Sequence, residues 1–528
     1  MSDAATPPAA PAQDWVSPVN PWIIAFAVML ATFMEVLDTS IANVALPHIA
    51  GSLSSTPNEA TWVLTSYLVA NAIVLPATGW LGGYFGRKRF LISCVIIFTV
   101  ASALCGAAGS LGSIVLFRAL QGAGGGALQP IAQSVLLESF PPKKRGLAMA
   151  VYGMGVVVAP IIGPTLGGWI TDSYSWRWVF YINVPIGIFA ITMIRAFVQD
   201  PPYLRKTRGS PIDYVGFGFM AVWLAAMQIV LDKGQEMDWF GTPWIRYLTV
   251  ISIVAFILFI IREMRAKEPI VHLGVFKNRN FAVGTFLIFV VGAALYSTTA
   301  MLPLFLQTLM NYPAFQSGLA ISPRGFGSLA SMVVAGRLVG IIDDRALMAF
   351  GFMILAYSMY LFAGINLNVS IMNVIWPGIV NGFAMGFIFV PLTTSTMGEL
   401  PLSDMNNGTG IYNLMRNVGG SVGISLSTTL LERMSQKQQA NMVYSVNPYS
   451  TVYQSRYHGL SALLSRGLGA PRALAASLGM FYRQVLLQAH LLVYVDLFRY
   501  LTWICILGAP LCFLFSKVRH TGKPIAAH

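Results

Sequence analysis

Residues 23–46 read IIAFAVMLATFMEVLDTSIANVAL, an apolar stretch that carries two acids, Glu35 and Asp38. A transmembrane helix needs about 20 apolar residues, and a carboxylate at membrane depth costs roughly 2.5–3.5 kcal/mol on insertion scales. Because they are three residues apart on a helix, Glu35 and Asp38 share one face. The stretch therefore predicts a membrane helix whose acids point into a protein interior or a water-filled cavity. The alternative is that Glu35 lies near a lipid-facing edge and has little function.

The composition of the whole chain agrees with a membrane protein. Of its 528 residues, 56% are hydrophobic and only 10% are charged, whereas soluble domains carry about 25% charged residues. The net charge of +13 does not indicate nucleic acid, because the basic residues fall in short loops where the positive-inside rule explains them. The four cysteines lie in apolar stretches, with a spacing that fits neither a disulfide framework nor a metal site. We predict no cofactor.

Further apolar stretches predict an all-α integral membrane protein with fourteen transmembrane helices. They begin near positions 22, 61, 90, 111, 147, 179, 213, 244, 281, 315, 346, 369, 408 and 489. Basic clusters on alternate loops place both termini in the cytoplasm. Residues 1–21 are expected to be a disordered cytoplasmic tail, and residues 517–528 a second tail. The polar, basic segment 432–488 is expected to be a long external loop.

An internal repeat at offsets of 256 to 260 positions relates the two halves of the chain. The matched pairs include Leu46-Pro47 with Leu302-Pro303, Gly79 with Gly336, Gln121-Gly122 with Asn381-Gly382, and Tyr152 with Tyr412. The repeat predicts two six-helix halves, residues 22–200 and 269–516, with two extra linking spans in residues 201–268. Parallel repeats of this kind, with a site at the midplane between the halves, are typical of secondary transporters.

Arg118 is the base expected to meet the acids. At 1.5 Å per residue, Asp38 lies roughly 13 Å and Arg118 roughly 10 Å inside the external ends of their helices. A buried arginine stays charged, and a nearby carboxylate compensates it. A change in burial, or in the distance to Arg118, would make the carboxylate take up or release a proton. The alternative is that Arg118 only ties helices together through backbone carbonyls.

Small and polar residues add two further groups of candidates. Glycines and prolines in the fifth span predict close, bendable helix packing, although tight packing alone explains them equally well. Aromatic and amide side chains are candidates for a substrate cavity, with ordinary packing as the alternative: Trp62, Tyr67, Asn71, Gln121 and Tyr412. The chain has no G-x-x-x-x-G-K-[ST] phosphate loop, which argues against an ATP-driven pump.

Six motifs together carry a resemblance to a known family. They are Leu37–Pro47, Gly79–Lys88, Arg118–Gly122, Gly163–Gly168, Trp176–Pro185 and Asn413–Asn417. Over about residues 22–516 the chain resembles the major facilitator superfamily, in particular its fourteen-span drug:proton antiporter group of EmrB/QacA type. The resemblance implies the major facilitator fold.

The resemblance also implies roles for individual residues. Asp38 and Arg118 would couple protons, and Glu35 is an extra acid that we expect to favour a cationic substrate or a second proton. Conformational and gating roles fall on the remaining motif residues: Gly79, Gly86, Arg87, Gly163, Pro164, Gly167, Gly168 and Arg416. Gly83 stands where the family usually has an acid, which puts the charge relay of that loop in doubt.

The expected function is proton-driven efflux of multiple drugs or toxic small molecules by alternating access across a bacterial inner membrane. The resemblance further implies a tripartite exporter, with an EmrA-like periplasmic adaptor and an outer-membrane channel as partners. One alternative is a dedicated exporter of a single metabolite, siderophore or antibiotic. Another is a membrane sensor or scaffold that has lost transport. An enzyme is not expected, because no nucleophile–base set or metal cluster occurs.

Overall fold

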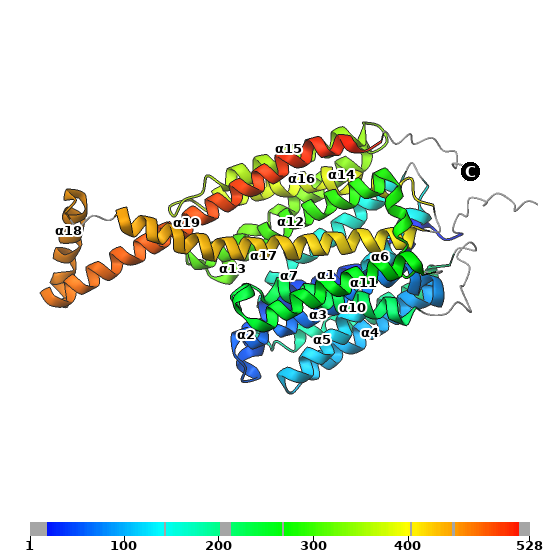
Figure 1. The fold of residues 1–528 in the computed structure, drawn as a ribbon, viewed down its shortest axis with the longest axis horizontal. Coiled ribbons are helices and arrows are strands. Elements are labelled where there is room, and N and C mark those ends of the chain that lie inside the picture. Colours follow the sequence, from blue (N-terminus) through cyan, green and yellow to red (C-terminus); the bar gives the residue numbers. More distant parts are fainter. Residues whose placement is uncertain are drawn as a thin grey trace, which may run out of the picture.

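The computed structural model describes residues 18–141, 144–200, 213–266, 269–401, 404–445 and 449–516. Within these ranges the regular structure is helical, apart from one isolated bridge between Val339 and Ile342. The two expected tails fall largely outside the described residues. Figure 1 shows two groups of helices side by side, with α17 (Met405–Ser445) running between them and past one end of both.

The first group comes from the N-terminal part of the chain. Its helices are α1 (Pro21–Ser52), α2 (Pro57–Ala60), α3 (Trp62–Phe85), α4 (Arg87–Ala107), α5 (Leu111–Gly125), α6 (Leu128–Ser139), α7 (Arg145–Ser173), α8 (Trp178–Tyr181) and α9 (Asn183–Phe197). Asn20 caps α1 by accepting a hydrogen bond from the backbone of Trp22. Outside the membrane spans, α2 begins with a capping box. There, hydrogen bonds from the backbone and side chain of Thr56 hold the pKa of Glu59 below its ordinary value.

The second group comes from the C-terminal part. It consists of α12 (Arg279–Thr308), α13 (Ala314–Ile321), α14 (Arg324–Leu338), α15 (Asp344–Phe362), α16 (Met372–Met397), α17, α18 (Thr451–Leu468) and α19 (Ala470–Leu511). Short 3-10 turns complete the described chain: η2 (Trp239–Gly241), η3 (Leu273–Lys277) and η5 (Cys512–Leu514).

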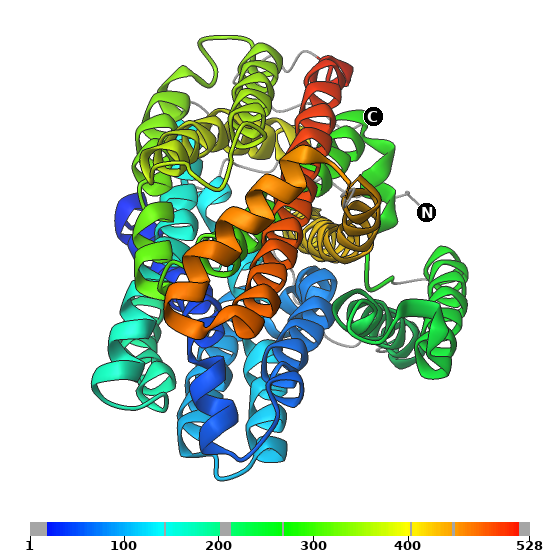
Figure 2. The same ribbon diagram turned by 90° about the vertical axis from the view of Figure 1, so that its left-hand side faces the viewer.

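Two further helices, α10 (Tyr214–Lys233) and α11 (Pro243–Arg265), lie at the edge of the bundle, where they are the green pair at the lower right of Figure 2. They pack mainly on each other, and α10 also packs on α3. Polar contacts fix that position: the Thr65 hydroxyl bonds to the Asp232 carboxylate, and the Gln228 amide donates to the Ser421 hydroxyl of α17 at 3.0 Å. Both helices present apolar residues to their surroundings, as membrane helices do.

Eleven helices of the described chain are long and apolar enough to cross a membrane. The three other predicted spans coincide with the pairs α5–α6 and α13–α14 and with α17. The first pair is broken after the glycine run that ends at Gly126, since glycine is a poor helix former. The second is broken at Ser322 and Pro323, because proline cannot continue the hydrogen-bond ladder.

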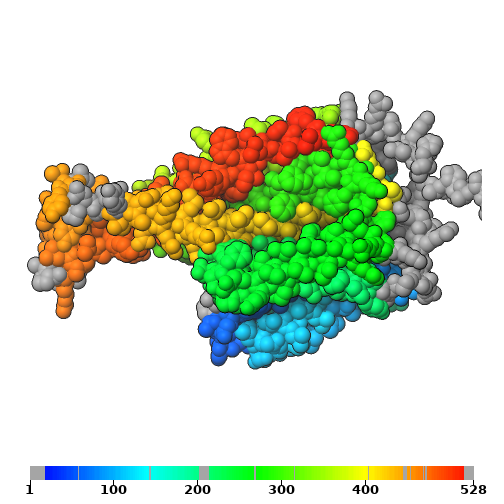
Figure 3. Space-filling view, viewed as in Figure 1, coloured from blue at the N-terminus to red at the C-terminus, as the bar shows by residue number. Residues whose placement is uncertain are grey.

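The described part of residues 432–488, the predicted external loop, is largely helical, a form that the sequence analysis did not predict. The ends of α17 and α19 continue beyond the bundle as helices and carry α18 between them, which gives the projection visible in Figures 1 and 3. The sequence from Ile424 to Val446 has neither glycine nor proline and is rich in good helix formers. Contacts between the arms stabilise it: the Gln439 amide donates to the Tyr482 hydroxyl at 2.8 Å, and Tyr453 packs edge-on against Phe481.

The first and last described helices begin and end at the same end of the bundle, opposite the projection. Trp22 at the start of α1 packs on Phe140 after α6. The two groups also touch there, since the Ser134 hydroxyl of α6 bonds to the Asn406 side chain of α17. A Cβ atom at Gly79 of α3 would lie 2.7 Å from the Asn407 Cα. The backbones of α3 and α17 are therefore in direct contact at this end.

Candidate functional site

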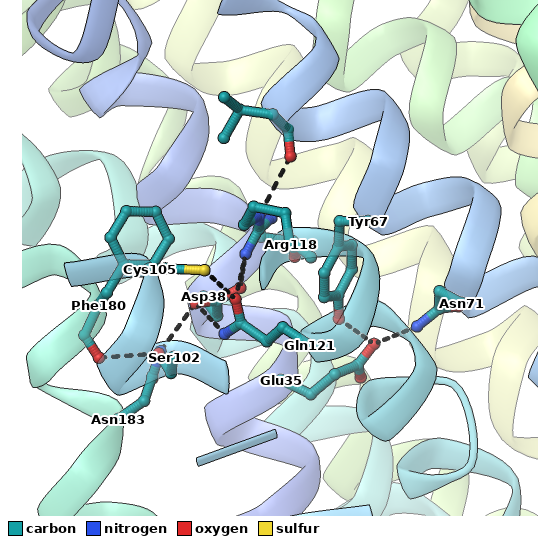
Figure 4. Close-up of polar contacts among 12 residues, drawn as sticks. Glu35, Asp38, Tyr67, Asn71, Ser102, Cys105, Arg118, Gln121, Phe180 and Asn183 are labelled. Atoms are coloured by element: carbon teal, nitrogen blue, oxygen red, sulfur yellow. Dashed lines mark hydrogen bonds and ion pairs between the residues drawn. The ribbon is translucent and has the colours of Figure 1, made fainter. Parts of the chain in front are cut away.

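Asp38 is fully buried on α1 and accepts hydrogen bonds from three side chains of two other helices, α5 and α9 (Figure 4). Arg118 Nη1 of α5 lies 2.5 Å from its Oδ2 atom, and Gln121 Nε2 of α5 lies 2.9 Å from its Oδ1 atom. Asn183 Nδ2 of α9 donates to the same Oδ1 atom at 2.7 Å. Charge-assisted hydrogen bonds of this kind are the strong ones in a protein interior. The carboxylate is therefore bound by donors from several directions.

Arg118 pairs with an acid and also bonds to a backbone carbonyl of a neighbouring helix. Besides the ion pair with Asp38, its Nε atom donates to the Val63 carbonyl of α3 at 3.1 Å. Its Nη1 atom also donates to the side-chain Oε1 atom of Gln121 at 2.9 Å. Its guanidinium lies 4.3 Å from the centre of the Tyr67 ring. The side chain thus ties α3, α5 and α1 together while it balances the buried acid.

A second layer of contacts positions these donors. The Asn183 amide also donates to the Ser102 hydroxyl of α4 at 3.0 Å, and that hydroxyl donates to the Phe180 carbonyl at 2.8 Å. The Cys105 thiol lies 3.6 Å from the Gln121 carbonyl oxygen. Four helices, α1, α4, α5 and α9, meet in one continuous polar network, since each shared group bonds in two directions.

Glu35 lies one helical turn from Asp38 and is also buried, with 4% of its surface exposed. It accepts hydrogen bonds from the Tyr67 hydroxyl and the Asn71 amide, both at 3.3 Å, and from the Gln129 amide at 2.6 Å. The side-chain carbonyl oxygen of Gln129 in turn accepts a hydrogen bond from Arg416 of α17. Glu35 therefore does not lie at a lipid-facing edge. It is linked through one amide to the second helical group.

Close helix approach brings these side chains together. A Cβ atom at Gly122 would lie 2.3 Å from the Tyr67 carbonyl, and one at Gly126 would lie 2.6 Å from the Asn71 carbonyl. Only glycine permits α5 and α3 to pack at that distance. As a result, Arg118 and Gln121 lie against α3 and reach Asp38 of α1.

The candidate cavity residues divide into two sets. Tyr67, Asn71 and Gln121 belong to the network around the two acids. Trp62 lies elsewhere, half-buried, with its ring 5.7 Å from the Lys233 ammonium. Tyr412 is fully buried in the second group, where its hydroxyl lies 3.1 Å from Thr393 of α16.

The gating candidates after α3 occupy a tight turn. Gly86 has φ of +86°, a conformation that favours glycine, and it separates α3 from α4. Arg87 is buried and pairs with Glu138 at the end of α6 at 2.5 Å. Asp200 accepts a hydrogen bond from the Lys88 backbone at 2.7 Å. Acids from α6 and from the segment after α9 thus contact the start of α4, close to Gly83, which lies in the last turn of α3.

The motif of α7 packs directly on α1. A Cβ atom at Gly163 would lie 2.3 Å from the Ser40 hydroxyl oxygen, and one at Gly167 would lie 3.0 Å from Ile41. A Cβ atom at Gly168 would meet no atom within 4 Å, so Gly168 takes no part in this contact. Pro164 faces the second group, since a Cβ atom at Gly318 of α13 would lie 3.9 Å from it.

Asn183 and Gln129 are the polar partners that sequence reasoning missed. Asn183 lies within the motif Trp176–Pro185, where an amide amid apolar residues is the available signal. Gln129 follows the glycine run of the fourth span, where an amide at membrane depth is again the available signal. In the described part of the chain, no group of three or more His, Cys, Asp or Glu side chains could hold a metal ion.

Comparison with known proteins settles the family. Residues 28–424 match the family model described as Major Facilitator Superfamily. The chain belongs to the major facilitator superfamily. It is 39% identical over 446 residues to the Multidrug export protein EmrB of Escherichia coli strain K12, covering 84% of this chain and 86% of that protein.

Two further relatives of the superfamily span most of the chain. The Fatty acid resistance protein FarB of Neisseria gonorrhoeae is 39% identical over 436 residues, covering 82% of this chain and 86% of its own length. The Colistin resistance protein EmrB of Acinetobacter baumannii is 30% identical over 509 residues, covering 96% and 98%.

A solved structure of the superfamily has the same fold. The human organic anion transporter MFSD10 superposes with a TM-score of 0.57 at 13% identity, covering 92% of this chain and 99% of that one. Together with the family and its apolar helices, this indicates a multi-pass membrane transporter of EmrB-like type rather than an enzyme.

Proposed function

We propose that this protein exports amphipathic small molecules in exchange for protons, by alternating access across a bacterial inner membrane. One observation carries the proposal: a fully buried carboxylate, Asp38, is held by an arginine and two amides from two other helices. An ionisable side chain inside a membrane protein is expensive and marks an ion or proton pathway.

The geometry gives protonation a structural effect. Ionised Asp38 binds α5 and α9 to α1 through Arg118, Gln121 and Asn183. A proton on the carboxylate removes its charge and breaks the ion pair, while Arg118 keeps the Val63 carbonyl and the Tyr67 ring as partners. Proton binding therefore loosens α1 from its neighbours without leaving the arginine unsatisfied.

Glu35 and Arg416 connect this change to the second half of the molecule. The Gln129 amide donates to Glu35 and accepts from Arg416. A proton on Glu35, or a cationic substrate beside it, weakens that connection because it removes the negative charge that orients the amide. The two acids thus supply a proton site and a link between the halves, assigned here as residues 22–200 and 269–516.

The substrate class follows from the relatives. Their names describe multidrug export, fatty acid resistance and colistin resistance. Such compounds share an apolar body with a polar or charged end. We carry that shared property, and no single compound, to this chain as the proposed substrate.

We further propose fourteen spans, both termini in the cytoplasm, and an adaptor docking on the projection formed by α17, α18 and α19. The projection lies at the end of the bundle opposite the one where α1 begins and α19 ends. It exposes apolar side chains, including Leu463, Leu474, Leu478 and Met480. Exposed apolar residues on a projecting element are suited to a protein partner. An EmrA-like adaptor leading to an outer-membrane channel fits that position.

Proton movement in inverted membrane vesicles tests the transport mechanism. Addition of a hydrophobic substrate should collapse a preformed proton gradient with the wild type and fail to do so with Asp38→Asn. If the response survives in Asp38→Asn and disappears in Glu35→Gln, the coupling site is Glu35 instead. If a well-folded wild type gives no response across a panel of hydrophobic compounds, proton-driven efflux is wrong.

Removal of α18 tests the docking surface. A variant with residues 449–468 replaced by a short Gly-Ser linker should keep proton movement in vesicles but lose drug resistance in cells. A matched variant with a Gly-Ser linker of the same length inserted after Gly109, between α4 and α5, should keep both. Full resistance in the α18 variant would contradict the proposed docking surface.

A further inference from the structure

Arg324 on α14 is a buried arginine with no acid paired to it. Only 9% of its surface is exposed. Its Nη1 atom donates to the Thr299 hydroxyl at 3.1 Å, while its Nη2 atom is buried without a hydrogen-bond partner. Among the ion pairs of the described residues, none includes Arg324. A buried, incompletely bonded cation is costly, so this side chain calls for an anionic partner.

Asn381 of α16 lies beside the same pocket and is likewise unsatisfied. It is 1% exposed, and neither its amide nitrogen nor its carbonyl oxygen has a hydrogen-bond partner. Arg324, Asn381 and Thr298 line one narrow pocket, too small in this conformation to hold a water molecule, whose other walls include Leu302, Ile321 and Phe362. Buried amides in native proteins are nearly always hydrogen-bonded. Two unsatisfied donors beside one pocket therefore point to a missing acceptor.

The internal repeat explains why no protein acid fills this place. On the offsets of the matched motifs, Asn381 is the counterpart of Gln121, and Arg324 is the counterpart of Tyr67. The position equivalent to Asp38 is Ala294, and the position equivalent to Arg118 is Gly378. The first half thus contains its own carboxylate, whereas the second half contains a cation and an amide with no carboxylate at the matching place.

We propose that Arg324 and Asn381 form a subsite for the carboxylate of an amphipathic organic acid, with the Arg324 Nη2 and Asn381 Nδ2 atoms as its donors. The inference rests on the proposed function, because the acid would be an export substrate. The pocket is closed in this conformation, so the acid would enter when α14 and α16 move apart, with its first carbon atoms against the apolar walls. Arginine to carboxylate is a strong, geometrically specific pairing.

Direct binding to the full-length protein tests this subsite without any proton gradient. The protein is placed in phosphatidylcholine nanodiscs and titrated with the fluorescent acid 11-(dansylamino)undecanoate and with its uncharged methyl ester. The acid should bind at least tenfold more tightly than the ester. Equal affinities in the wild type would overturn the proposal, and this comparison needs no variant.

Variants then locate the interaction. Arg324→Gln should weaken acid binding at least tenfold and leave ester binding unchanged, whereas Arg324→Lys should lose less. Arg337→Gln removes the same charge from an exposed position of the same helix and should change neither affinity. Where Arg324→Gln does not fold, Asn381→Ala serves instead. Acid binding that stays at the wild-type level in the folded variant would overturn the proposal.

Two further arms separate the anion source and the underlying function. In phosphatidylglycerol nanodiscs the acid should keep its affinity. A tenfold loss there would mean that a lipid phosphate occupies the subsite and would overturn the assignment to an organic acid. Asp38→Asn should still bind the acid, since it changes only the first half. Acid binding through Arg324 without substrate-driven proton movement would sink the proposed function alone, and the reverse result would sink the subsite alone.

Discussion

Asp38 lies at the centre of the hydrogen-bond network of the first helical group. One carboxylate accepts hydrogen bonds from α5 and α9, and those donors continue the network into α3 and α4. A proton bound to the Asp38 carboxylate would therefore alter contacts among five helices: α1, α3, α4, α5 and α9. Glu35, one turn away, likewise accepts from three side chains of two other helices, α3 and α6.

Removal of Arg118 should destabilise the protein strongly, because it leaves Asp38 buried and unpaired. We expect Arg118→Ala to lose about 3–5 kcal/mol of unfolding free energy. The double variant Asp38→Asn/Arg118→Gln should recover much of that loss, since neither side chain is then charged. Thermal unfolding in detergent measures both. A double variant no more stable than Arg118→Ala would contradict the ion-pair explanation.

Asn183→Ala should affect stability and transport, because the amide joins Asp38 to Ser102. Loss of a donor to a buried carboxylate costs about 1–3 kcal/mol, and we expect efflux to slow at a fixed gradient. Asn43→Ala is the matched control: Asn43 is exposed on α1 and donates only to the Thr39 carbonyl of its own helix. It should stay within about 0.5 kcal/mol of the wild type. Equal losses in the two variants would show that Asn183 has no special role.

The sequence predicted part of this network and not the rest. Depth arithmetic placed Arg118 in the layer of Asp38, and the structure places the two side chains 2.5 Å apart. Asn183 and Gln129 were not predicted, because hydropathy identifies a membrane helix without saying which faces meet. Their partners lie far away along the chain, so the pairing depends on how α9 and α6 pack. Charges at membrane depth are conspicuous, whereas amides there are not.

At the scale of helices, α7 packs closely on α1 because two glycines of α7 have no side chain at the contact. Ser40 and Ile41 of α1 occupy the space in which Gly163 and Gly167 would carry a Cβ atom. The Ser40 hydroxyl also bonds to the Pro160 carbonyl at 3.3 Å, one of the carbonyls near the prolines of α7. The helix that contains the bendable segment is thus in contact with the helix that contains both acids.

Glycine substitutions on α7 test whether a motif glycine is needed for its contact with α1 or only for its place in the motif. Gly163→Ala inserts a methyl group 2.3 Å from the Ser40 oxygen, and we expect a loss of about 1–3 kcal/mol from overpacking, together with slower transport. Gly168→Ala meets no atom within 4 Å and should be neutral, or more stable by up to about 1 kcal/mol. Unfolding and efflux assays on both variants check this. A Gly168→Ala variant as damaged as Gly163→Ala would contradict the packing explanation.

The helices themselves were largely predictable, because a bilayer leaves few alternatives to an apolar helix of fixed length. A helix begins near each of the fourteen predicted positions except 489, which falls inside the long helix α19. The interruptions between α5 and α6 and between α13 and α14 were not predicted. Nor was the helical form of residues 432–488, since polarity indicates solvent exposure and does not exclude helix. Helix propensity over Ile424–Val446 was the signal available there.

For the whole molecule, the question is how the two helical groups separate and rejoin. Gly79→Val should prevent contact at the end where they touch, because its side chain would strike the backbone at Asn407. We expect transport to fall at least tenfold. In a background without native cysteines, a Ser134→Cys reporter, fully buried in the wild type, should be labelled by thiol reagents at least tenfold faster.

Gly82→Ala is the control for this effect, since its Cβ atom would lie 3.7 Å from the Asn406 side chain, at ordinary contact distance. It should leave both transport and labelling unchanged. Unchanged labelling in Gly79→Val would mean that this end tolerates the larger side chain, and that the contact between α3 and α17 is not required for closure.

The continuity of α17 has a mechanical consequence. Its 41 residues make a rod about 60 Å long at 1.5 Å per residue, with Arg416 near one end and the projection at the other. A tilt of roughly 10° about the inner end of a rod of that length would sweep the outer tip through about 10 Å. A partner bound to the tip would then be displaced once in each transport cycle. That displacement would follow protonation at a carboxylate that the partner does not contact.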